Sequence, residues 1–161
     1  MIRMSKLTDY AIVLLSQLAR SSDQSLHSAR DLAAAAHIPV PTVNKLLKKL
    51  SHAGLLVSHR GANGGYSLAR KATEISVGQV LVAMEGPVAL TECGIEATGI
   101  CVLESSCPVR SSWQNINRAI RRALEGLSLS DMIRPPPPVG AISPAPAFSL
   151  LPSLGLTGGA R

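Results

Sequence analysis

Residues 28–68 read SARDLAAAAHIPVPTVNKLLKKLSHAGLLVSHRGANGGYSL, a run that predicts two short helices followed by a hairpin. Ser28 and Asp31 have the spacing of a capping box, in which side chains satisfy the free N–H groups at a helix start. A short apolar helix is therefore expected over residues 32–36. It should stop before Pro39 and Pro41, because proline breaks a helix, and a second helix should follow at once.

The second predicted helix covers residues 42–52, and its two faces differ in chemistry. Apolar residues recur at spacings of three and four and form an inner face: Val43, Leu46, Leu47 and Leu50. Polar and basic residues fall outside that face: Asn44, Lys45, Lys48, Lys49 and Ser51. Gly54 should cap the C-terminus of this helix, where glycine is the usual residue.

Two short extended runs come next, over residues 55–59 and 66–68, and they flank the sequence RGANGG. Its glycines and asparagine favour a tight turn, so a hairpin is expected. Helix, turn, helix and hairpin predict a mainly α fold, a winged helix-turn-helix with a two-stranded wing. A lysine-bearing helix face is common on solvated surfaces, but a basic hairpin tip beside it suits contact with DNA phosphates.

The predicted DNA contacts lie on the second helix and on the wing. Recognition helices present their N-terminal residues to base edges, so Thr42, Asn44 and Lys45 are expected to face the major groove. Phosphate or minor-groove contacts are expected from the remaining basic and wing residues: Lys48, Lys49, Arg60, Asn63, Gly64 and Gly65.

Charge and aromatic content narrow the choice of partner. Residues 1–71 hold ten Lys or Arg against three Asp or Glu, whereas residues 72–161 hold six against seven. This asymmetry favours a nucleic acid as the partner of the N-terminal half, although a membrane surface would also accept a basic patch. The chain has only two Tyr, one Trp and one Phe, too few to stack the bases of single strands, so duplex DNA is expected.

The chain divides into four predicted segments. A winged helix-turn-helix DNA-binding domain covers residues 1–85, a cysteine loop 86–108, a dimerisation helix 109–133 and a disordered tail 134–161. The tail holds seven of the eleven prolines and has no charge between its terminal arginines, a composition typical of disordered or polyproline chain. The apolar run over residues 11–15 is too short for a signal peptide or a membrane span, so we expect a cytoplasmic protein.

An apolar stripe follows the long helix predicted over residues 109–127, and it consists of Trp113, Ile116, Ile120, Ala123 and Leu127. The DNA-binding domain should close its own core, so we expect the same helix of a second subunit to cover the stripe. The alternative is that the helix folds back onto its own chain. A homodimer also matches DNA sites with two-fold symmetry.

All three cysteines, Cys93, Cys101 and Cys107, lie in a segment without a helical or strand period. Loops of this length are usually functional or disordered. Free thiols are one interpretation and zinc is another, but structural zinc sites favour CxxC pairs and four Cys or His ligands, and the histidines lie far upstream. An iron–sulfur cluster held by three thiolates and one foreign ligand fits this set better.

Four stretches carry a family resemblance: SKLTDYAIVLL at 5–15, GLLVSHRGANGGYSLAR at 54–70, the cysteine loop, and WQNINRAIRRALEGLSLSDM at 113–132. Over about residues 1–133 the chain resembles the iron–sulfur-sensing winged-helix regulators typified by IscR and NsrR, and most closely regulators of the SUF cluster-assembly operon. The resemblance implies a homodimeric transcription factor, usually a repressor, whose 2Fe–2S or 4Fe–4S cluster alters its affinity for DNA.

One ligand of the IscR-like pattern is absent. Those proteins have a histidine three residues after the last cysteine, where this chain has Arg110. Other groups that could complete the set are loop carboxylates, exogenous thiol or water; the loop carboxylates are Glu92, Glu96 and Glu104. Asp9 matches the position from which NsrR-like members supply an aspartate to the opposite subunit. Its alternative role is stabilisation of the helix dipole at a first turn.

We therefore expect a dimeric, cluster-sensing regulator of iron–sulfur assembly genes that binds duplex DNA, without enzymatic activity, membrane partner or small-molecule substrate. One alternative is a cluster-free thiol redox switch on the same DNA-binding scaffold. An alternative of another class is a small iron–sulfur electron carrier. The missing CxxC pair and the basic DNA-binding domain count against that carrier.

Overall fold

The computed structural model describes residues 4–21, 25–61, 64–92, 101–102 and 106–135. Within them, the helices are α1 (Lys6–Arg20), α2 (Ala29–Ala36), α3 (Val40–His52), α4 (Val77–Glu85), α5 (Arg110–Glu125) and α6 (Leu129–Ile133). The strands β1 (Leu56–His59) and β2 (Gly65–Leu68) pair antiparallel, and the 3-10 turn η1 (Ala72–Glu74) follows them. The predicted mainly α fold with a two-stranded wing is confirmed.

Serine side chains cap the starts of α1, α2, α4 and α6, as the sequence predicts for α2. Ser28 Oγ accepts a hydrogen bond from the Asp31 N–H at 3.2 Å and donates to Asp31 Oδ2 at 2.7 Å. The predicted starts of α2 and α3 are nonetheless late. Proline explains the second, because Pro41 lies in the first turn of α3, where no N–H partner is needed. Gly54 ends α3 as predicted: it follows the C-cap residue Ala53 with a positive φ of 70°, and its N–H donates to the Ser51 carbonyl at 3.0 Å.

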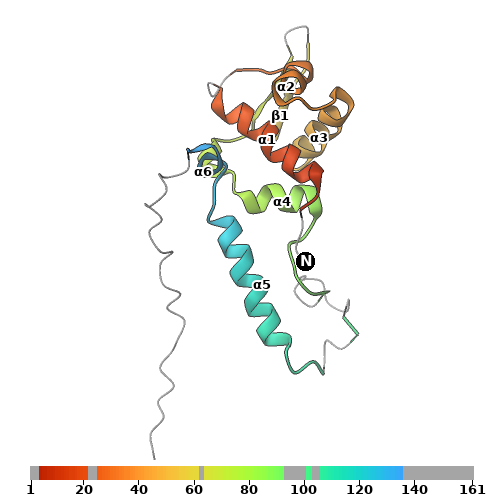
Figure 1. Cartoon of the computed structure of the whole chain (residues 1–161), viewed down its shortest axis with the longest axis vertical. Coiled ribbons are helices and arrows are strands. Elements are labelled where there is room, and N and C mark those ends of the chain that lie inside the picture. Colours follow the sequence, from red (N-terminus) through yellow and green to blue (C-terminus); the bar gives the residue numbers. More distant parts are fainter. Residues whose placement is uncertain (1–3, 22–24, 62–63, 93–100, 103–105, 136–161) are drawn as a thin grey trace, which may run out of the picture.

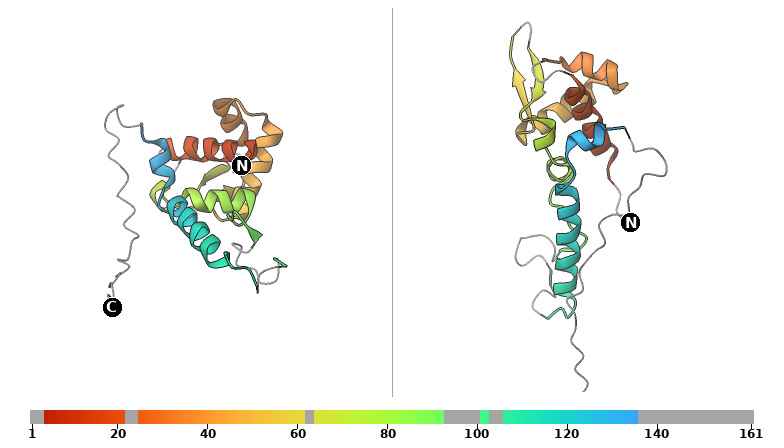
Figure 2. Two further views of the ribbon diagram at one scale, coloured as in Figure 1. Left: turned by 60° about the horizontal axis from the view of Figure 1, so that its bottom comes forward. Right: turned by 90° about the vertical axis from the view of Figure 1, so that its left-hand side faces the viewer.

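The core lies where α1, α2, α3 and α4 meet the base of the hairpin. It is built mostly of leucine, and the inner face predicted for α3 is buried throughout: Val43, Leu46, Leu47 and Leu50. We call α1 to α4, the hairpin and α6 the winged domain. In Figures 1 and 2, α5 extends away from this domain, with α4 lying between the two.

The segment predicted as one dimerisation helix, residues 109–133, forms two helices in the structure. α5 ends at Glu125, and a capping box between Ser128 and Asp131 begins α6, which packs back on α1. Leu129 is fully buried there, and its N–H donates to the Ile75 carbonyl at 2.8 Å. Residues 129–133 therefore belong to the winged domain. No helix within the described residues is long and apolar enough to cross a membrane.

Candidate DNA-binding surface and sensor segment

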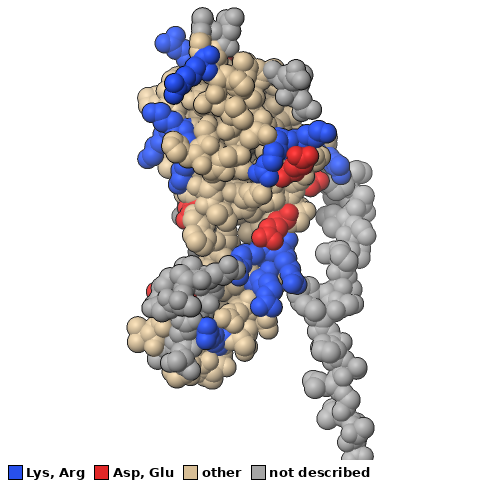
Figure 3. Space-filling view, turned by 180° about the vertical axis from the view of Figure 1, so that it is seen from behind, with Lys and Arg blue, Asp and Glu red and all other residues tan. Residues whose placement is uncertain are grey.

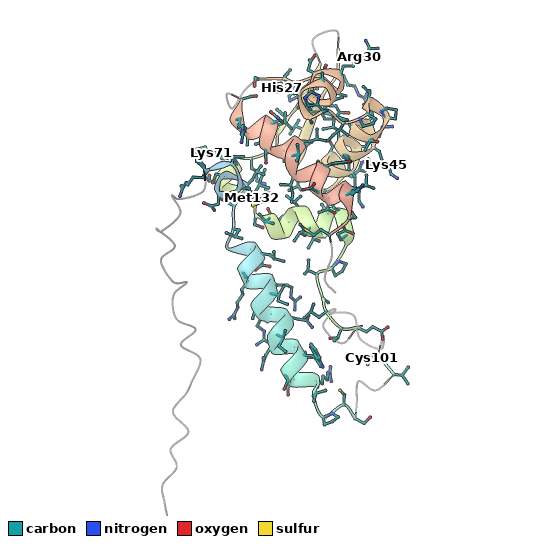
Figure 4. The ribbon with its side chains drawn as sticks, in the orientation of Figure 1. His27, Arg30, Lys45, Lys71, Cys101 and Met132 are labelled. Atoms are coloured by element: carbon teal, nitrogen blue, oxygen red, sulfur yellow. The ribbon has the colours of Figure 1, made fainter. Side chains whose placement is uncertain are left out.

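The residues predicted to meet base edges share one exposed face of α3. Asn44 and Lys45 are exposed near the start of the helix, with Thr42 half-buried beside them. Lys48 continues this face one turn later. Figure 4 shows Lys45 projecting from α3 away from the body of the molecule, and Figure 3 shows Lys and Arg side chains around the winged domain. This face can therefore be presented to a DNA groove.

Lys49 lies at the edge of that face and has a partner within the protein. Its ammonium group donates a hydrogen bond of 2.7 Å to the carbonyl of Met84, near the C-terminal end of α4. A cation is favourable there because the carbonyl end of a helix carries partial negative charge. Lys49 thus ties the predicted recognition helix to α4. The predicted contact of Lys49 with phosphate would require its ammonium to leave Met84.

The wing is held by its main chain. The N–H of His27 donates to the Tyr66 carbonyl at 3.1 Å, and the N–H of Tyr66 donates to the His27 carbonyl at 2.9 Å. A Cβ on Gly65 would lie 2.7 Å from that His27 oxygen, and a Cβ on Gly64 would collide with the His59 carbonyl. Close backbone approach therefore accounts for both glycines. Arg60 is exposed beside the turn, and Asn63 lies outside the described residues.

A hydrogen-bonded junction joins the start of α1 to the end of α4. The hydroxyl of the fully buried Thr8 donates to Glu85 Oε1, and the N–H of Ser5 donates to the same oxygen at 3.1 Å. Hydrogen bonds from Ser5 and Thr8, together with the charge of Lys49, lower the pKa of Glu85 below its ordinary value. Asp9, adjacent to Thr8, is exposed in the first turn of α1.

The cysteine loop is fixed on α5 at both ends. On its entry side, the N–H of Leu90 donates to Asn117 Oδ1 at 2.7 Å, and Asn117 Nδ2 donates to Thr91 Oγ1 at 3.3 Å. Asn117 is 1% exposed, so this link is buried. On the exit side, Cys107 lies three residues before the start of α5. Cys101 and Cys107 are half-buried free thiols, whereas Cys93 lies outside the described residues.

The sequence-predicted metal ligands do not meet within the described part of one chain. No three His, Cys, Asp or Glu side chains gather there, so Asp9, Cys101 and Cys107 form no shared site in a single subunit. The two free thiols suit iron–sulfur ligation in kind, since iron–sulfur clusters favour thiolate ligands. Glu92 is exposed at the loop entry, while Glu96 and Glu104 lie outside the described residues.

The predicted dimerisation stripe is uncovered in the single chain. Trp113, Ile116 and Leu127 are 36%, 43% and 47% exposed, Ala123 is exposed and Ile120 is half-buried. A different face of α5, centred on Asn117, packs towards α4 and the loop entry. Within the described residues, the stripe therefore does not fold back onto its own chain, the alternative left open by the sequence.

Comparison with known proteins identifies the family. A family model described as Rrf2, iron-dependent transcriptional regulator, matches residues 4–135. The HTH-type transcriptional regulator NsrR of Oceanobacillus iheyensis is 31% identical over 131 residues, covering 81% of this chain and 89% of that protein. These similarities span the winged domain, the cysteine loop and α5.

Two solved structures agree with the fold. CymR, the global cysteine regulator of B. subtilis, superposes with a TM-score of 0.64 at 25% identity, covering 83% of this chain and 97% of that one. IscR of T. potens gives a TM-score of 0.61 at 26% identity, covering 82% and 86%. NsrR is named as a transcriptional regulator and CymR as a regulator, and neither is named as an enzyme. The chain is a DNA-binding transcriptional regulator and belongs to the Rrf2 family.

Proposed function

We propose that this regulator represses iron–sulfur assembly genes as a homodimer and senses cluster status, oxygen or nitric oxide through its cysteine loop. The observation that carries the proposal is the pair of free thiols, Cys101 and Cys107, in a loop whose entry is pinned to α5 by Asn117. Thiolates held on a fixed scaffold suit a redox-sensitive cluster, which supplies the reaction with oxygen or nitric oxide when bound.

The uncovered stripe on α5 supports a dimer in which the long helices of two subunits pack together. Such a dimer also allows a cross-subunit ligand. Asp9 does not meet the cysteines of its own chain but is exposed at the start of α1, so we assign it as the carboxylate offered to the partner's loop. This ligand would replace the histidine whose position Arg110 occupies.

The junction at the end of α4 supports a route from sensor to DNA. Asp9 adjoins Thr8, Thr8 donates to Glu85, and the neighbouring carbonyl of Met84 accepts from Lys49 of α3. The cysteine loop begins directly after this end of α4. A change in the ligation of Asp9 would therefore reach the recognition helix through two hydrogen bonds and the chain neighbours that link them, which gives two states with different DNA affinity.

A cluster-free thiol switch on the same scaffold is the second candidate. The structure of CymR, the global cysteine regulator of B. subtilis, is as similar in fold as that of IscR, and Cys101 and Cys107 are both partly accessible. Thiol oxidation would then replace cluster loss as the signal. The two candidates differ in whether iron and sulfide accompany the protein.

Anaerobic purification separates them. We expect a coloured protein with iron and acid-labile sulfide, and DNA binding that changes when nitric oxide is added. The Asp9→Ala variant should keep its fold and dimer, hold a more labile cluster and lose the cluster-dependent change in DNA binding. Glu92→Ala is the matched control and should behave as wild type. A colourless protein whose DNA binding responds to a disulfide-forming oxidant would instead establish the thiol switch.

A further inference from the structure

A hollow of about 300 Å³ lies between the winged domain and α5. Leu55, at the end of the α3–β1 connection, forms one wall, while Val82 of α4 and Leu124 of α5 form others. Val88, near the start of the cysteine loop, completes the apolar lining. The volume is at the lower end of the roughly 300–1,000 Å³ range typical of small-molecule sites.

Local packing explains why the space stays open. α4 and α5 approach closely at Gly78, where a Cβ would lie 3.3 Å from Cγ of Glu125. Farther along, Asn117 fixes the loop entry to α5 through Leu90. Between these two attachments, the side chains facing the space include the small Ala53 and Ala83. The helices are thus held together at two points by contacts that do not fill the hollow.

Polar side chains converge on the same hollow. Arg70 Nη2 donates to Gln79 Oε1 at 3.4 Å, and Gln79 is itself held by the capping box that begins α4. Arg121, half-buried on α5, is a second guanidinium lining the hollow. Glu125 is the one carboxylate in the lining, so positive charge prevails. Figure 3 shows basic side chains gathered at the level of α5, next to an acidic one.

The hollow is separate from the predicted dimer contact. Arg121 follows Ile120 by one residue, which in an α-helix turns it by about 100° away from the apolar stripe. Leu124 and Arg121 share the face that packs towards α4, whereas Trp113 and Ile116 are exposed on another face of α5. A second subunit covering the stripe therefore does not by itself occupy the hollow.

We propose that this hollow binds a small carboxylate with a branched aliphatic body. The carboxylate pairs with the guanidinium groups of Arg70 and Arg121, which hydrogen-bond planar anions well. The aliphatic body lies against Val82, Val88 and Leu124 and removes their apolar surface from water. This inference goes beyond the proposed function, since it gives the regulator a second input that needs neither a cluster nor a cysteine.

An occupant of this hollow contacts two parts of the molecule at once. The α3–β1 connection, the segment after β2 and α4 line one side, and α5 lines the other. Ligand binding therefore favours arrangements in which the winged domain and α5 keep their present separation. Since α5 carries the proposed dimer contact, the ligand would also bias the placement of the two winged domains.

Titration of the full-length, isotope-labelled protein with 4-methylpentanoate tests the proposal. We expect saturable shifts of the amide resonances of Ala53, Gly78 and Ala83. The uncharged 4-methylpentanamide should bind about tenfold more weakly, because a charge-assisted hydrogen bond is lost. Arg121→Gln should weaken acid binding to a similar degree. Arg122→Gln, on the adjacent exposed position outside the lining, is the matched control and should leave binding unchanged.

Ala53→Leu provides an independent check, since this exposed position allows a larger side chain that would fill the hollow. It should abolish the shifts without unfolding the protein. The proposal is overturned if the acid produces no saturable shifts, or if acid and amide bind equally. Equal weakening by Arg121→Gln and Arg122→Gln would also overturn it, since general charge attraction would then suffice. These readouts involve neither cluster nor DNA, so they are independent of the outcome for the cluster sensor.

Discussion

Two helices of this chain have an apolar face with the same three- and four-residue spacing, and only one of those faces is covered. On α3, Val43, Leu46, Leu47 and Leu50 are at most 1% exposed, because α1, α2 and α4 pack over them. On α5, Ile116 is 43% exposed, and Leu127, just after the helix, is 47% exposed. Apolar periodicity thus identifies a face that needs cover. It does not tell whether the cover comes from the same chain.

The largest expected effect concerns the uncovered face. The double variant Ile116→Asp and Ile120→Asp should separate the dimer, because association would bury two charges without partners, at a cost of several kcal/mol each. Sedimentation equilibrium measures the change. Ser111→Asp, exposed on another face of α5, is the control and should remain dimeric. A double variant that is still dimeric would place the subunit contact elsewhere.

A substitution on the covered face of α3 should instead change the stability of the fold. Leu47→Ala removes a fully buried side chain of α3 and should lower the free energy of unfolding by about 2–5 kcal/mol. Ile120→Ala is the paired change on α5 and should act mainly on dimer affinity. Urea unfolding followed at several protein concentrations distinguishes the two effects. Similar, concentration-independent losses for both variants would contradict the contrast between the helices.

The junction between α1 and α4 should make the stability of the winged domain depend on pH. The pKa of Glu85 lies below its usual 4.5 in the folded chain, so the stabilisation is present above about pH 4.5 and is lost as the pH falls through the lowered value. Glu85→Gln should therefore be less stable than wild type at pH 7 and approach it in acid. Glu74→Gln, also exposed, serves as the control. A constant difference in stability between Glu85→Gln and wild type across this pH range would show that ionisation of the Glu85 carboxylate is not the cause.

The smallest expected effect is a difference in DNA binding between variants of two adjacent lysines of α3. Lys48→Ala should weaken binding to all DNA sequences and lower the slope of log affinity against log salt by about one unit. Lys49→Ala should change that slope less, because its ammonium is bonded to Met84. Binding measured over a range of salt concentrations tests this. Equal changes for the two variants would mean that Lys49 leaves Met84 when DNA binds.

Local patterns predicted the local structure. The spacing of Val43 and Leu47 gave the inner face of α3, and the pair of Ser28 and Asp31 gave the start of α2. The sequence also contains the capping pair that begins α6, Ser128 and Asp131. It was missed because Leu127 continues the apolar spacing of α5.

Long-range polar contacts left no comparable signal. Thr8 is fully buried because it bonds Glu85, 77 residues away, and Asn117 is buried because it bonds the loop entry. Neither residue stands out by its spacing, because a buried polar side chain is defined by its partner and not by its neighbours in sequence. The same holds for Lys49, whose partner Met84 lies 35 residues further along the chain. Polar contacts between elements far apart in the chain were therefore the part that sequence patterns missed.

The attachment of the wing has a consequence for how such a regulator can diverge. His27 and Tyr66 hold each other through main-chain atoms, and Gly65 needs only to lack a side chain. Positions of the turn between β1 and β2 other than Gly61, which has a positive φ, and Gly64, which lacks room for a Cβ, can therefore exchange residues while the base of the wing keeps the same position. Surface turns of this kind tolerate insertion and substitution well. If the wing contacts DNA as predicted, substitutions at its tip would change those contacts without any adjustment of the core beneath it.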